Sequence, residues 1–235
     1  MFGAVTALDT VSLTVPSGGF TAIVGRSGCG KSTLLKLCNG LEQPDSGTVR
    51  LGGQVLDYQR LETTRRNIGY AVQGTGLFPH LDVAANIALL ARLSHWSKTD
   101  IEERVTALVQ LMQLPAEVVS RYPHELSGGQ QQRVGLCRAM MLRPPALLLD
   151  EPFAAIDPLT RRDIHQHMLQ LHAQEPCTTL LVTHDMQEAM LLADTIVVMD
   201  AGAIVQQLST QELRQKASGA DPEAVLLSLI PSAAQ

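Results

Sequence analysis

The chain has 235 residues, of which 45% are hydrophobic and 17% are charged, and its formal net charge at pH 7 is -5. A chain of this length and composition can bury a sizeable core and suits one globular domain. Its acidic balance, without a long run of lysine or arginine, lacks the electrostatic footprint of a nucleic-acid-binding protein, so we expect no nucleic-acid partner. The four cysteines include no C-x-x-C pair, which predicts reduced thiols.

The N-terminal residues 1–10, MFGAVTALDT, have neither the basic region nor the apolar run of a secretory signal. No apolar run elsewhere approaches the roughly 18 residues expected of a membrane-spanning helix. We therefore expect the chain to stay in the cytoplasm and to meet a membrane only through a partner protein.

Two segments predict a small antiparallel β layer. Residues 11–15, VSLTV, alternate apolar and polar side chains, which is typical of a half-buried strand. Residues 47–56, GTVRLGGQVL, predict a hairpin that turns at Gly52 and Gly53.

Four short, continuous apolar runs predict a second sheet, which is parallel and buried. Helical stretches separate the runs, as in α/β proteins. The runs are FTAIVG at 20–25, ALLLDEP at 146–152, TTLLVTHD at 178–185 and TIVVMD at 195–200.

The first apolar run leads into IVGRSGCGKST, which fits the phosphate-loop pattern G-x-x-x-x-G-K-[ST] between a predicted strand and a predicted helix. The glycines let backbone amides point at one centre, Lys31 reaches the outer phosphates and Ser32 can ligate Mg²⁺. The sequence therefore predicts a triphosphate site that consists of Gly25, Ser27, Gly28, Cys29, Gly30, Lys31, Ser32 and Thr33.

Apolar residues recur at helical spacing between about residues 77 and 125, most clearly from Ile101 to Met112. This pattern predicts a helical insert. Thr99 and Glu102 predict a capping box at the start of its principal helix.

We expect a single domain over residues 1–235, with a helical subdomain at about 77–135 inserted in its core. The tail at about 211–235 predicts one or two helices and is too short for a regulatory domain.

The sequence LSGGQQQR at 126–133 predicts a helix start with Ser127 and Gln130 in a capping box. Each of the two glycines in its first turn costs roughly 1 kcal/mol relative to alanine in a helix interior, and a cap alone does not require them. We infer that something approaches this backbone closely.

Two acidic residues end the run LLLDEP. Asp150 closes a buried strand, where a carboxylate needs a cation or hydrogen bonds, and Mg²⁺ is the natural partner. The adjacent Glu151 points differently and is the predicted base that deprotonates an attacking water. The alternative is a plain N-cap or salt-bridge pair.

Two further polar residues are candidates on weaker grounds. His184 follows a buried strand, where ligands of open α/β sheets collect, but a lone histidine can equally be structural. Gln73 lies between Gly74 and Gly76. It is neutral and able to touch water and Mg²⁺ while its loop moves.

Taken together, the phosphate loop, Gln73, LSGGQQQR, LLLDEP, Asp157 and His184, in this order, resemble the ATPase subunits of ABC transporters across nearly the whole chain. LSGGQ is the hallmark that separates this family from other phosphate-loop ATPases. The resemblance implies an α/β phosphate-loop NTPase (RecA-like) core with an antiparallel β subdomain and an inserted α-helical subdomain. It implies ATP and Mg²⁺ as cofactors, with Glu151, His184 and Gln73 as catalytic residues and Ser32, Gln73 and Asp150 around the metal.

In that family two ATPase domains close head to tail over two ATP molecules. The resemblance therefore implies a homodimer in which Ser127, Gly128, Gly129 and Gln130 face the γ-phosphate held by the second copy. Asp157 matches the loop along this interface, although the preceding Ala-Ala-Ile departs from the commoner Gly-Ala-Leu or Ser-Ala-Leu.

Phe2 occupies the position of the aromatic residue that stacks on adenine in the family. Relatives usually begin with a further strand before this residue. The departure leaves two alternatives, a truncated sheet edge or a natural start upstream of the given one.

Leu77, Phe78 and Pro79 predict an exposed apolar patch, and in the family such a region receives a coupling helix from the membrane subunit. The resemblance thus implies integral membrane permease subunits as partners, a substrate-binding protein as an indirect one, and a place at the cytoplasmic face of the inner membrane. The alternative for Phe78 is ordinary packing of the helical insert.

The sequences GYAVQGTGLFPH, HWSK and RYPHELSGGQQQRVG resemble the subgroup that serves uptake of osmoprotectants, namely glycine betaine, choline, carnitine or proline. Import of other amines or amino acids is the alternative within transport. A soluble ABC ATPase in DNA repair or translation is the alternative outside transport.

Overall fold

The computed structural model describes residues 6–74, 76–217 and 222–228. The chain divides into two compact units. Unit 1 consists of residues 1–64 and 178–235, and unit 2 of residues 65–177.

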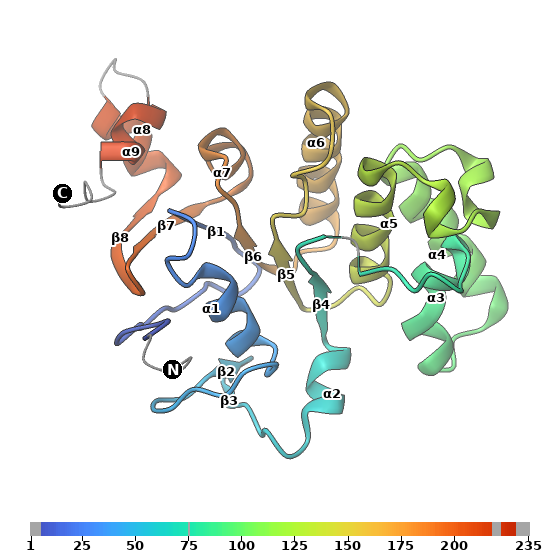
Figure 1. Ribbon diagram of the computed structural model, residues 1–235, viewed down its shortest axis with the longest axis horizontal. Coiled ribbons are helices and arrows are strands. Elements are labelled where there is room, and N and C mark those ends of the chain that lie inside the picture. The colour runs from blue at the N-terminus through green and yellow to red at the C-terminus, as the bar shows by residue number, and fades with distance from the viewer. Residues whose placement is uncertain (1–5, 75, 218–221, 229–235) are drawn as a thin grey trace. The chain divides into compact units, whose positions relative to one another are not determined.

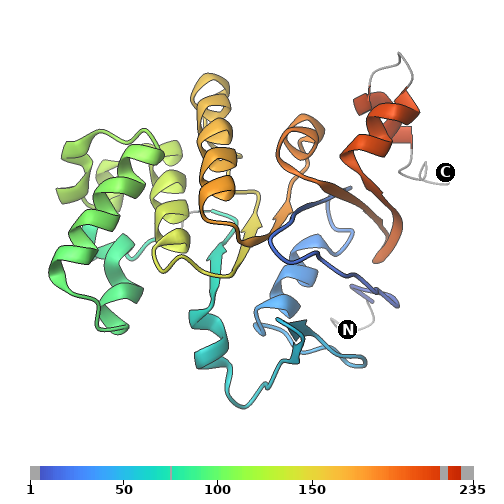
Figure 2. The same cartoon turned by 180° about the vertical axis from the view of Figure 1, so that it is seen from behind.

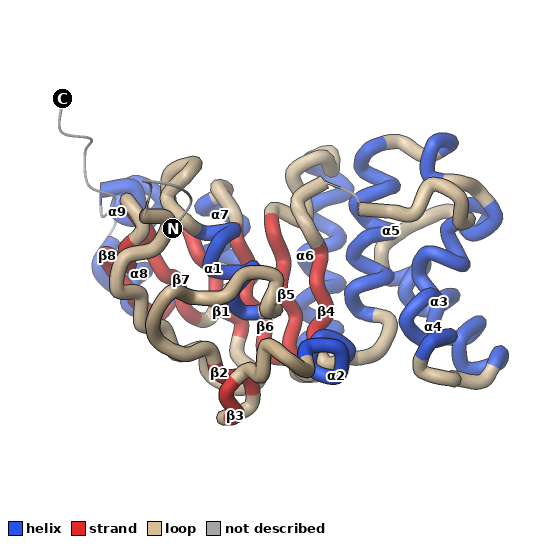
Figure 3. The backbone as a smooth tube through the Cα atoms, turned by 60° about the horizontal axis from the view of Figure 1, so that its bottom comes forward, coloured by secondary structure: helices blue, strands red, loops and turns tan. Residues whose placement is uncertain are grey.

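The core of unit 1 is a sheet in the order β6-β1-β7-β8 (Figure 3). Its strands are β1 (Phe20–Gly25), β6 (Thr178–Val182), β7 (Thr195–Asp200) and β8 (Ala203–Ser209). The first three strands are parallel, and β8 runs antiparallel to β7. All six residues of β1 are buried, which confirms the prediction of a buried parallel sheet.

The described part of unit 1 contains four helices besides α2, which lies at the boundary of the units. Helix α1 (Lys31–Cys38) follows β1, and α7 (Met186–Leu192) follows β6. Helices α8 (Thr210–Ala217) and α9 (Pro222–Ser228) pack side by side near the C-terminus (Figure 2). The prediction of one or two helices in the tail is confirmed.

The predicted strand at residues 11–15 is wrong, because this segment has no strand in the structure. Its side chains do alternate between half-buried and exposed, as the pattern required. Alternation of exposure is decided by the side chains, whereas a strand also needs hydrogen-bonded partners along its backbone. The sequence pattern reports only the first of these conditions.

The predicted hairpin is confirmed. Strands β2 (Arg50–Leu51) and β3 (Gln54–Val55) pair antiparallel around Gly52 and Gly53. Both glycines have positive φ, 56° and 79°, as a two-residue hairpin turn requires. Helix α2 (Leu61–Arg66) follows at the boundary between the units and has no buried residue.

Unit 2 has two parallel strands, β4 (Ile68–Ala71) and β5 (Ala146–Asp150). Three of its helices, α3, α4 and α5, lie beside one another (Figure 1). The predicted helical stretch is therefore confirmed. The helices are α3 (Val83–Leu93), α4 (Lys98–Leu111), α5 (Gly128–Met140) and α6 (Pro158–Gln174), with 3-10 helices η1 (Ala116–Ser120) and η2 (Pro123–Glu125).

Helix α4 begins earlier than the sequence predicted, so the capping box of Thr99 and Glu102 is wrong. Ser97 is the N-cap, and its hydroxyl accepts from the amide of Asp100 at 3.1 Å. The same hydroxyl donates to the Asp100 carboxylate at 2.7 Å. The Ser97 hydroxyl thus makes two hydrogen bonds with Asp100, and Ser97 caps the helix in place of Thr99.

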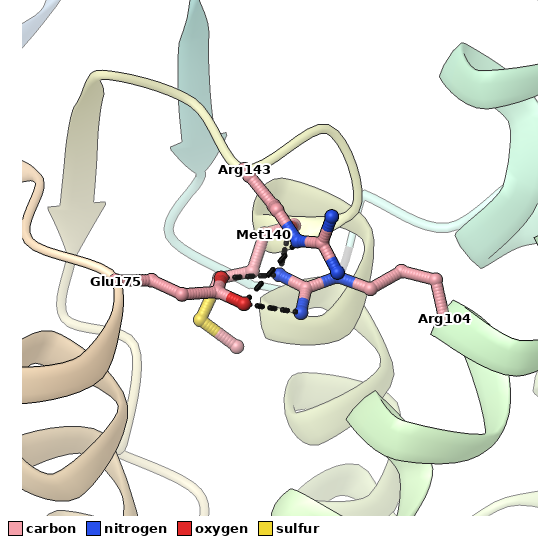
Figure 4. A network of polar contacts seen from close by, with 4 residues as sticks. All are labelled: Arg104, Met140, Arg143 and Glu175. Carbon is pink, nitrogen blue, oxygen red and sulfur yellow. Dashed lines mark hydrogen bonds and ion pairs between the residues drawn. The ribbon is translucent and has the colours of Figure 1, made fainter. Parts of the chain in front are cut away.

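A polar network joins three helices of unit 2 (Figure 4). Arg104 of α4 is only 7% exposed, and its guanidinium donates two hydrogen bonds to the Glu175 carboxylate, at 3.0 and 3.2 Å. It also donates to the carbonyl of Met140 at the end of α5, at 3.0 Å. Arg143 donates to the same carboxylate at 3.2 Å. Since Glu175 is the C-cap residue of α6, the Arg104 guanidinium ties the ends of α5 and α6 to α4.

Helix length bears on how the chain could meet a membrane. The 17-residue α6 falls short of the roughly 20 residues of a membrane-spanning helix. None of the helices in the described ranges is long and apolar enough to cross a membrane.

Candidate functional site

The phosphate loop of unit 1 connects β1 to α1. Gly25, Gly28 and Gly30 have φ values of 154°, 80° and 102°, which residues with a side chain rarely adopt. A Cβ at Gly25 would also overlap the carbonyl oxygen of Met199 on the neighbouring strand. These positions therefore favour glycine, and the loop ends at a helix N-terminus, where anions are stabilised.

Lys31 is the first residue of α1, directly after this loop. Its side chain is 7% exposed, and Nζ donates to the carbonyl oxygens of Gly25 and Arg26, both at 2.8 Å. A buried ammonium needs such partners. Cys29 is also buried, with Sγ at 3.8 Å from the same ammonium. Of the other predicted loop residues, Ser27 and Gly28 are exposed, and Ser32 and Thr33 are half-buried.

His184 is exposed between β6 and α7. Strand β6 is the parallel neighbour of β1, with Val182 opposite Ile23. His184 is two residues beyond Val182, as Gly25 is two residues beyond Ile23. The structure therefore brings His184 to the edge of the sheet where the phosphate loop begins, as the sequence predicted.

Asp150 and Glu151 lie at the end of β5 in unit 2. Asp150 is 4% exposed. The pKa of Tyr70 on the adjacent strand is raised to about 12, first by burial and second by the charge of Asp150. Glu151 has φ of 48° and is half-buried, so the backbone turns sharply between the two carboxylates. Neither residue is the N-cap of α6, so the N-cap alternative for the pair is wrong.

Gln73 and Glu151 meet in the structure. The Gln73 amide nitrogen lies 3.4 Å from a carboxylate oxygen of Glu151 and donates to it. Strands β4 and β5 are parallel with Ala71 opposite Leu149, so the two residues follow their strands at the same level. A carboxylate and a neutral amide are thereby held together at one end of the β4–β5 pair.

The start of α5 has the predicted capping box. The Ser127 hydroxyl accepts from the amide of Gln130 at 3.2 Å, and the Gln130 side chain accepts from the amide of Ser127 at 3.0 Å. Ser127 and Gly128 are exposed. This helix start can therefore present backbone amides to an anion outside the unit.

The two glycines of this start have different surroundings. A Cβ at Gly128 would meet only the Ala155 methyl group, at an ordinary 3.9 Å. A Cβ at Gly129 would lie 3.0 Å from the Ala155 carbonyl oxygen. Packing within unit 2 thus accounts for Gly129, whereas Gly128 has no such internal reason.

Asp157 is the N-cap of α6. Its carboxylate accepts from the amide of Thr160 at 3.0 Å, and this hydrogen bond is the main cause of its lowered pKa. Leu159, two residues on, is 81% exposed. The segment between Glu151 and Asp157 packs against α5 through Ala155.

The predicted apolar patch has two exposed members. Phe78 is 42% exposed, Pro79 is exposed and Leu77 is half-buried. The fully buried Asn86 fixes Phe78 through hydrogen bonds to its amide and its carbonyl, at 2.8 and 3.1 Å. The guanidinium of Arg138 lies 5.8 Å from the ring centroid. Phe78 is therefore held in place while part of its ring faces outward.

Sequence reasoning missed Gln132. The LSGGQQQR stretch contains three consecutive glutamines, and its composition does not single one out. In the structure Gln132 is 8% exposed and accepts from the amide of Ala155. The helical period was the available signal, since Gln132 lies four residues before the buried Leu136, on the same face of α5.

Phe2, the predicted adenine-stacking residue, lies outside the described residues. In the described ranges there is no cluster of three or more His, Cys, Asp or Glu side chains that could hold a metal.

A family model described as "ABC transporter" matches residues 8–154, more than half of the chain. The match includes the phosphate loop, LSGGQQQR and the pair of Asp150 and Glu151. The chain belongs to the ABC transporter family. The predicted α/β phosphate-loop NTPase fold is thereby confirmed.

Curated relatives of this ABC transporter chain carry names from two transport classes. It is 46% identical over 207 residues to the glycine betaine uptake system ATP-binding protein YehX of Escherichia coli (strain K12), covering 88% of this chain and 67% of that protein. It is 47% identical over 212 residues to the sulfate/thiosulfate import ATP-binding protein CysA of Gloeobacter violaceus, covering 90% and 61%.

Other relatives, 41 to 44% identical, are named for transport of choline, carnitine or osmoprotectants. The chain spans between about half and two thirds of the length of these curated relatives.

A solved structure supports the same fold. The chain matches the dimeric, post-hydrolysis structure of an ATP-binding cassette bound to ADP and Pi, with a TM-score of 0.83 and 31% identity. The match covers 88% of this chain and 91% of that one.

Proposed function

We propose that this chain is the ATP-binding and ATP-hydrolysing subunit of an ABC importer for osmoprotectants such as glycine betaine, choline, carnitine or proline. Membership of the ABC transporter family and the names of its relatives support the proposal. The observation that carries the hydrolytic part is the contact between Gln73 and Glu151. It holds an ionisable base beside a neutral residue able to bond a water molecule.

The phosphate loop is the proposed binding site for the phosphates of ATP. Its amides and the helix N-terminus stabilise anionic oxygens, and Lys31 adds a positive charge. The loop carbonyls of Gly25 and Arg26 hold the Lys31 ammonium beside the loop amides. His184, at the same edge of the sheet, is the proposed contact of the terminal phosphate.

Mg²⁺ fits the proposed donor set. Ser32, Gln73 and Asp150 offer a hydroxyl, an amide and a carboxylate, which are the oxygen donors that this hard cation prefers. Asp150 places its carboxylate at the end of β5, where it is 4% exposed. When bound, Mg²⁺ supplies charge neutralisation on the phosphate oxygens.

Glu151 is the proposed general base. A base removes a proton from the water that attacks the terminal phosphoryl group, and such groups typically contribute 10²- to 10⁴-fold. Gln73 holds the carboxylate through its amide, and the same amide group is the proposed contact of the water. Product ADP and phosphate then leave when the site opens.

The second half of each ATP site is proposed to come from another copy of the chain. The capped start of α5 exposes Ser127 and Gly128, and Gly128 has no packing reason within unit 2 to be glycine. A γ-phosphate on the partner copy would supply that reason. Asp157 and the exposed Leu159 follow on the loop that the family resemblance assigns to this interface.

Leu77, Phe78 and Pro79 are the proposed docking residues for an integral membrane permease, which would hold the chain at the cytoplasmic face of the inner membrane. The partial exposure of Phe78, on a backbone fixed by Asn86, supports this role. A substrate-binding protein would deliver the cargo to the permease.

Sulfate or thiosulfate import is a second candidate cargo class, because the relative named for it is 47% identical. Among the relatives named above, more are named for quaternary amines or osmoprotectants than for sulfate, and this favours the first class. The fold and the ATP site are the same under both candidates.

The test is ATP hydrolysis by the chain in liposomes with the membrane proteins that co-purify with it in detergent, together with their binding protein. We expect glycine betaine, choline or carnitine to stimulate hydrolysis and sulfate to leave it unchanged. Stimulation by sulfate alone would transfer the function to the second candidate. Hydrolysis that responds to nucleic acid, with no co-purifying permease, would reject transport altogether.

A further inference from the structure

One buried side-chain amide links α5, the helix that begins in LSGGQQQR and is called the signature helix below, to the loop that carries the proposed base. Gln132 is 8% exposed, and its Oε1 accepts a hydrogen bond from the backbone amide of Ala155 at 2.7 Å. Ala155 lies between Glu151 and Asp157. Burying a polar side chain costs free energy unless the side chain is hydrogen-bonded, and the Ala155 amide supplies this partner for Gln132.

The backbone of α5 approaches the same loop at a second point. Gly129 lies about one turn before Gln132. A Cβ atom at this position would lie only 3.0 Å from the Ala155 carbonyl oxygen. Both backbone polar groups of Ala155 therefore contact α5. Its amide donates a hydrogen bond to Gln132, and its carbonyl packs closely against Gly129. The loop has little room to shift along α5.

Two buried side chains of the loop also hold it in the core of unit 2. Phe153 and Ile156 are 1% and 3% exposed, and the amide of Ile156 bonds to the carbonyl of Phe153 at 3.1 Å. Between these anchors, Gln132 supplies the bond from α5. The conformation of the backbone that leaves Glu151 is thereby set by a residue on another element.

Gln132 also reaches the neighbourhood of Gln73. It lines a small cavity of about 10 Å³, which has room for about one water molecule. The cavity wall includes Val72 and Gly74, the neighbours of Gln73, and Pro152, the neighbour of Glu151. One glutamine thus adjoins both segments whose side chains meet in the contact between Gln73 and Glu151.

We propose that Gln132 is a positioning residue for ATP hydrolysis, which holds the loop 151–157 against α5 so that Glu151 keeps its place beside Gln73. The inference rests on the proposed function, since it assigns Gln132 a role in that reaction. Gln132 acts through Glu151 and touches no substrate. Its loss should therefore lower kcat and leave the affinity for ATP unchanged.

The test compares two substitutions of Gln132 in the full chain. Gln132→Met keeps the length of the side chain and removes the acceptor, whereas Gln132→Glu keeps an oxygen that can accept from Ala155. We expect Gln132→Met to lower kcat about tenfold, because small misplacements of a catalytic group have effects of this order. Its KM for ATP should stay within about twofold, and Gln132→Glu should restore most of the rate.

A double mutant separates positioning from a general structural role. In Glu151→Gln, followed under single-turnover conditions, adding Gln132→Met should cause no further loss, because Gln132 acts only through the carboxylate that is already gone. A purely structural residue would lower the rate by the same factor in both backgrounds. Gln166→Met, at an exposed position of α6, is the control for the same chemical change.

The outcomes are distinct. If the wild type hydrolyses ATP and Gln132→Met does so at the same rate, the inference is overturned and the proposed function stands. Equal losses for Gln132→Met and Gln132→Glu would have the same meaning. Wild type without ATP hydrolysis would overturn the proposed function and the inference with it. If Gln132→Met does not fold, Gln132→Asn withdraws the amide by one methylene and should show the same loss of kcat.

Discussion

At the residue scale, the two glycines of the signature helix have separate physical reasons. Gly129 faces the Ala155 carbonyl at a distance that leaves little room for a methyl group, whereas Gly128 is exposed and open. Alanine is preferred over glycine inside helices by roughly 1 kcal/mol. The same substitution should therefore have opposite consequences at the two positions.

We predict that Gly128→Ala leaves the free energy of unfolding unchanged or slightly higher, yet lowers ATP hydrolysis by about tenfold or more, because its methyl group obstructs the approach of a phosphate. Gly129→Ala should lower the free energy of unfolding by about 1 kcal/mol, since overpacking is destabilising. Urea denaturation and steady-state hydrolysis measure the two effects. Equal stability losses at both positions would contradict the assignment.

At the element scale, unit 2 relies on the network of Arg104 and Glu175. The guanidinium is almost buried and makes charge-assisted bonds to the carboxylate and to the end of α5. The carboxylate is 33% exposed, so solvent screens part of the attraction. The chief consequence of breaking the network is a carboxylate and a carbonyl that lose a donor.

We predict that Arg104→Met lowers the free energy of unfolding by about 2 kcal/mol, the order expected of hydrogen bonds to charged groups. The matched control is Lys98→Met on the same helix. Lys98 pairs with Glu102 at 3.7 Å, but both side chains are well exposed, at 89% and 66%. Its loss should change stability by less than about 0.5 kcal/mol in the same denaturation experiment. Comparable losses for the two variants would reject the network as a stabilising feature.

At the scale of the whole molecule, the proposed ATP site is complete only in a pair of chains. Slowing hydrolysis should therefore trap the pair. Glu151→Gln keeps the shape of the base and removes its charge, so hydrolysis should fall by ~100-fold or more while ATP still binds.

We predict that Glu151→Gln with ATP and Mg²⁺ has twice the 25.4 kDa mass of one chain in light scattering, and returns to one chain with ADP. Adding Gly128→Asp should abolish the pair without preventing ATP binding, because a carboxylate at the exposed helix start repels the partner's γ-phosphate. A monomer at saturating ATP would remove the second copy from the proposed site.

Features that depend on neighbours along the chain could be predicted from the amino-acid sequence. The phosphate loop, the capping box of Ser127 and Gln130, the hairpin at Gly52 and Gly53, and the buried parallel strands follow from spacing and apolar runs, because φ preferences, caps and periodicity are local. The position of Glu151 after a strand was readable for the same reason.

Contacts between features that are distant in the sequence depend on the folded arrangement. It gave residues 11–15 no strand partner, and it assigned Gly129 and Gln132 to the packing of one alanine that lies more than 20 positions away. It also joined Arg104 to Glu175, 71 residues apart. Such pairs follow from how buried polar groups and close contacts are satisfied in three dimensions, which spacing along the chain does not encode.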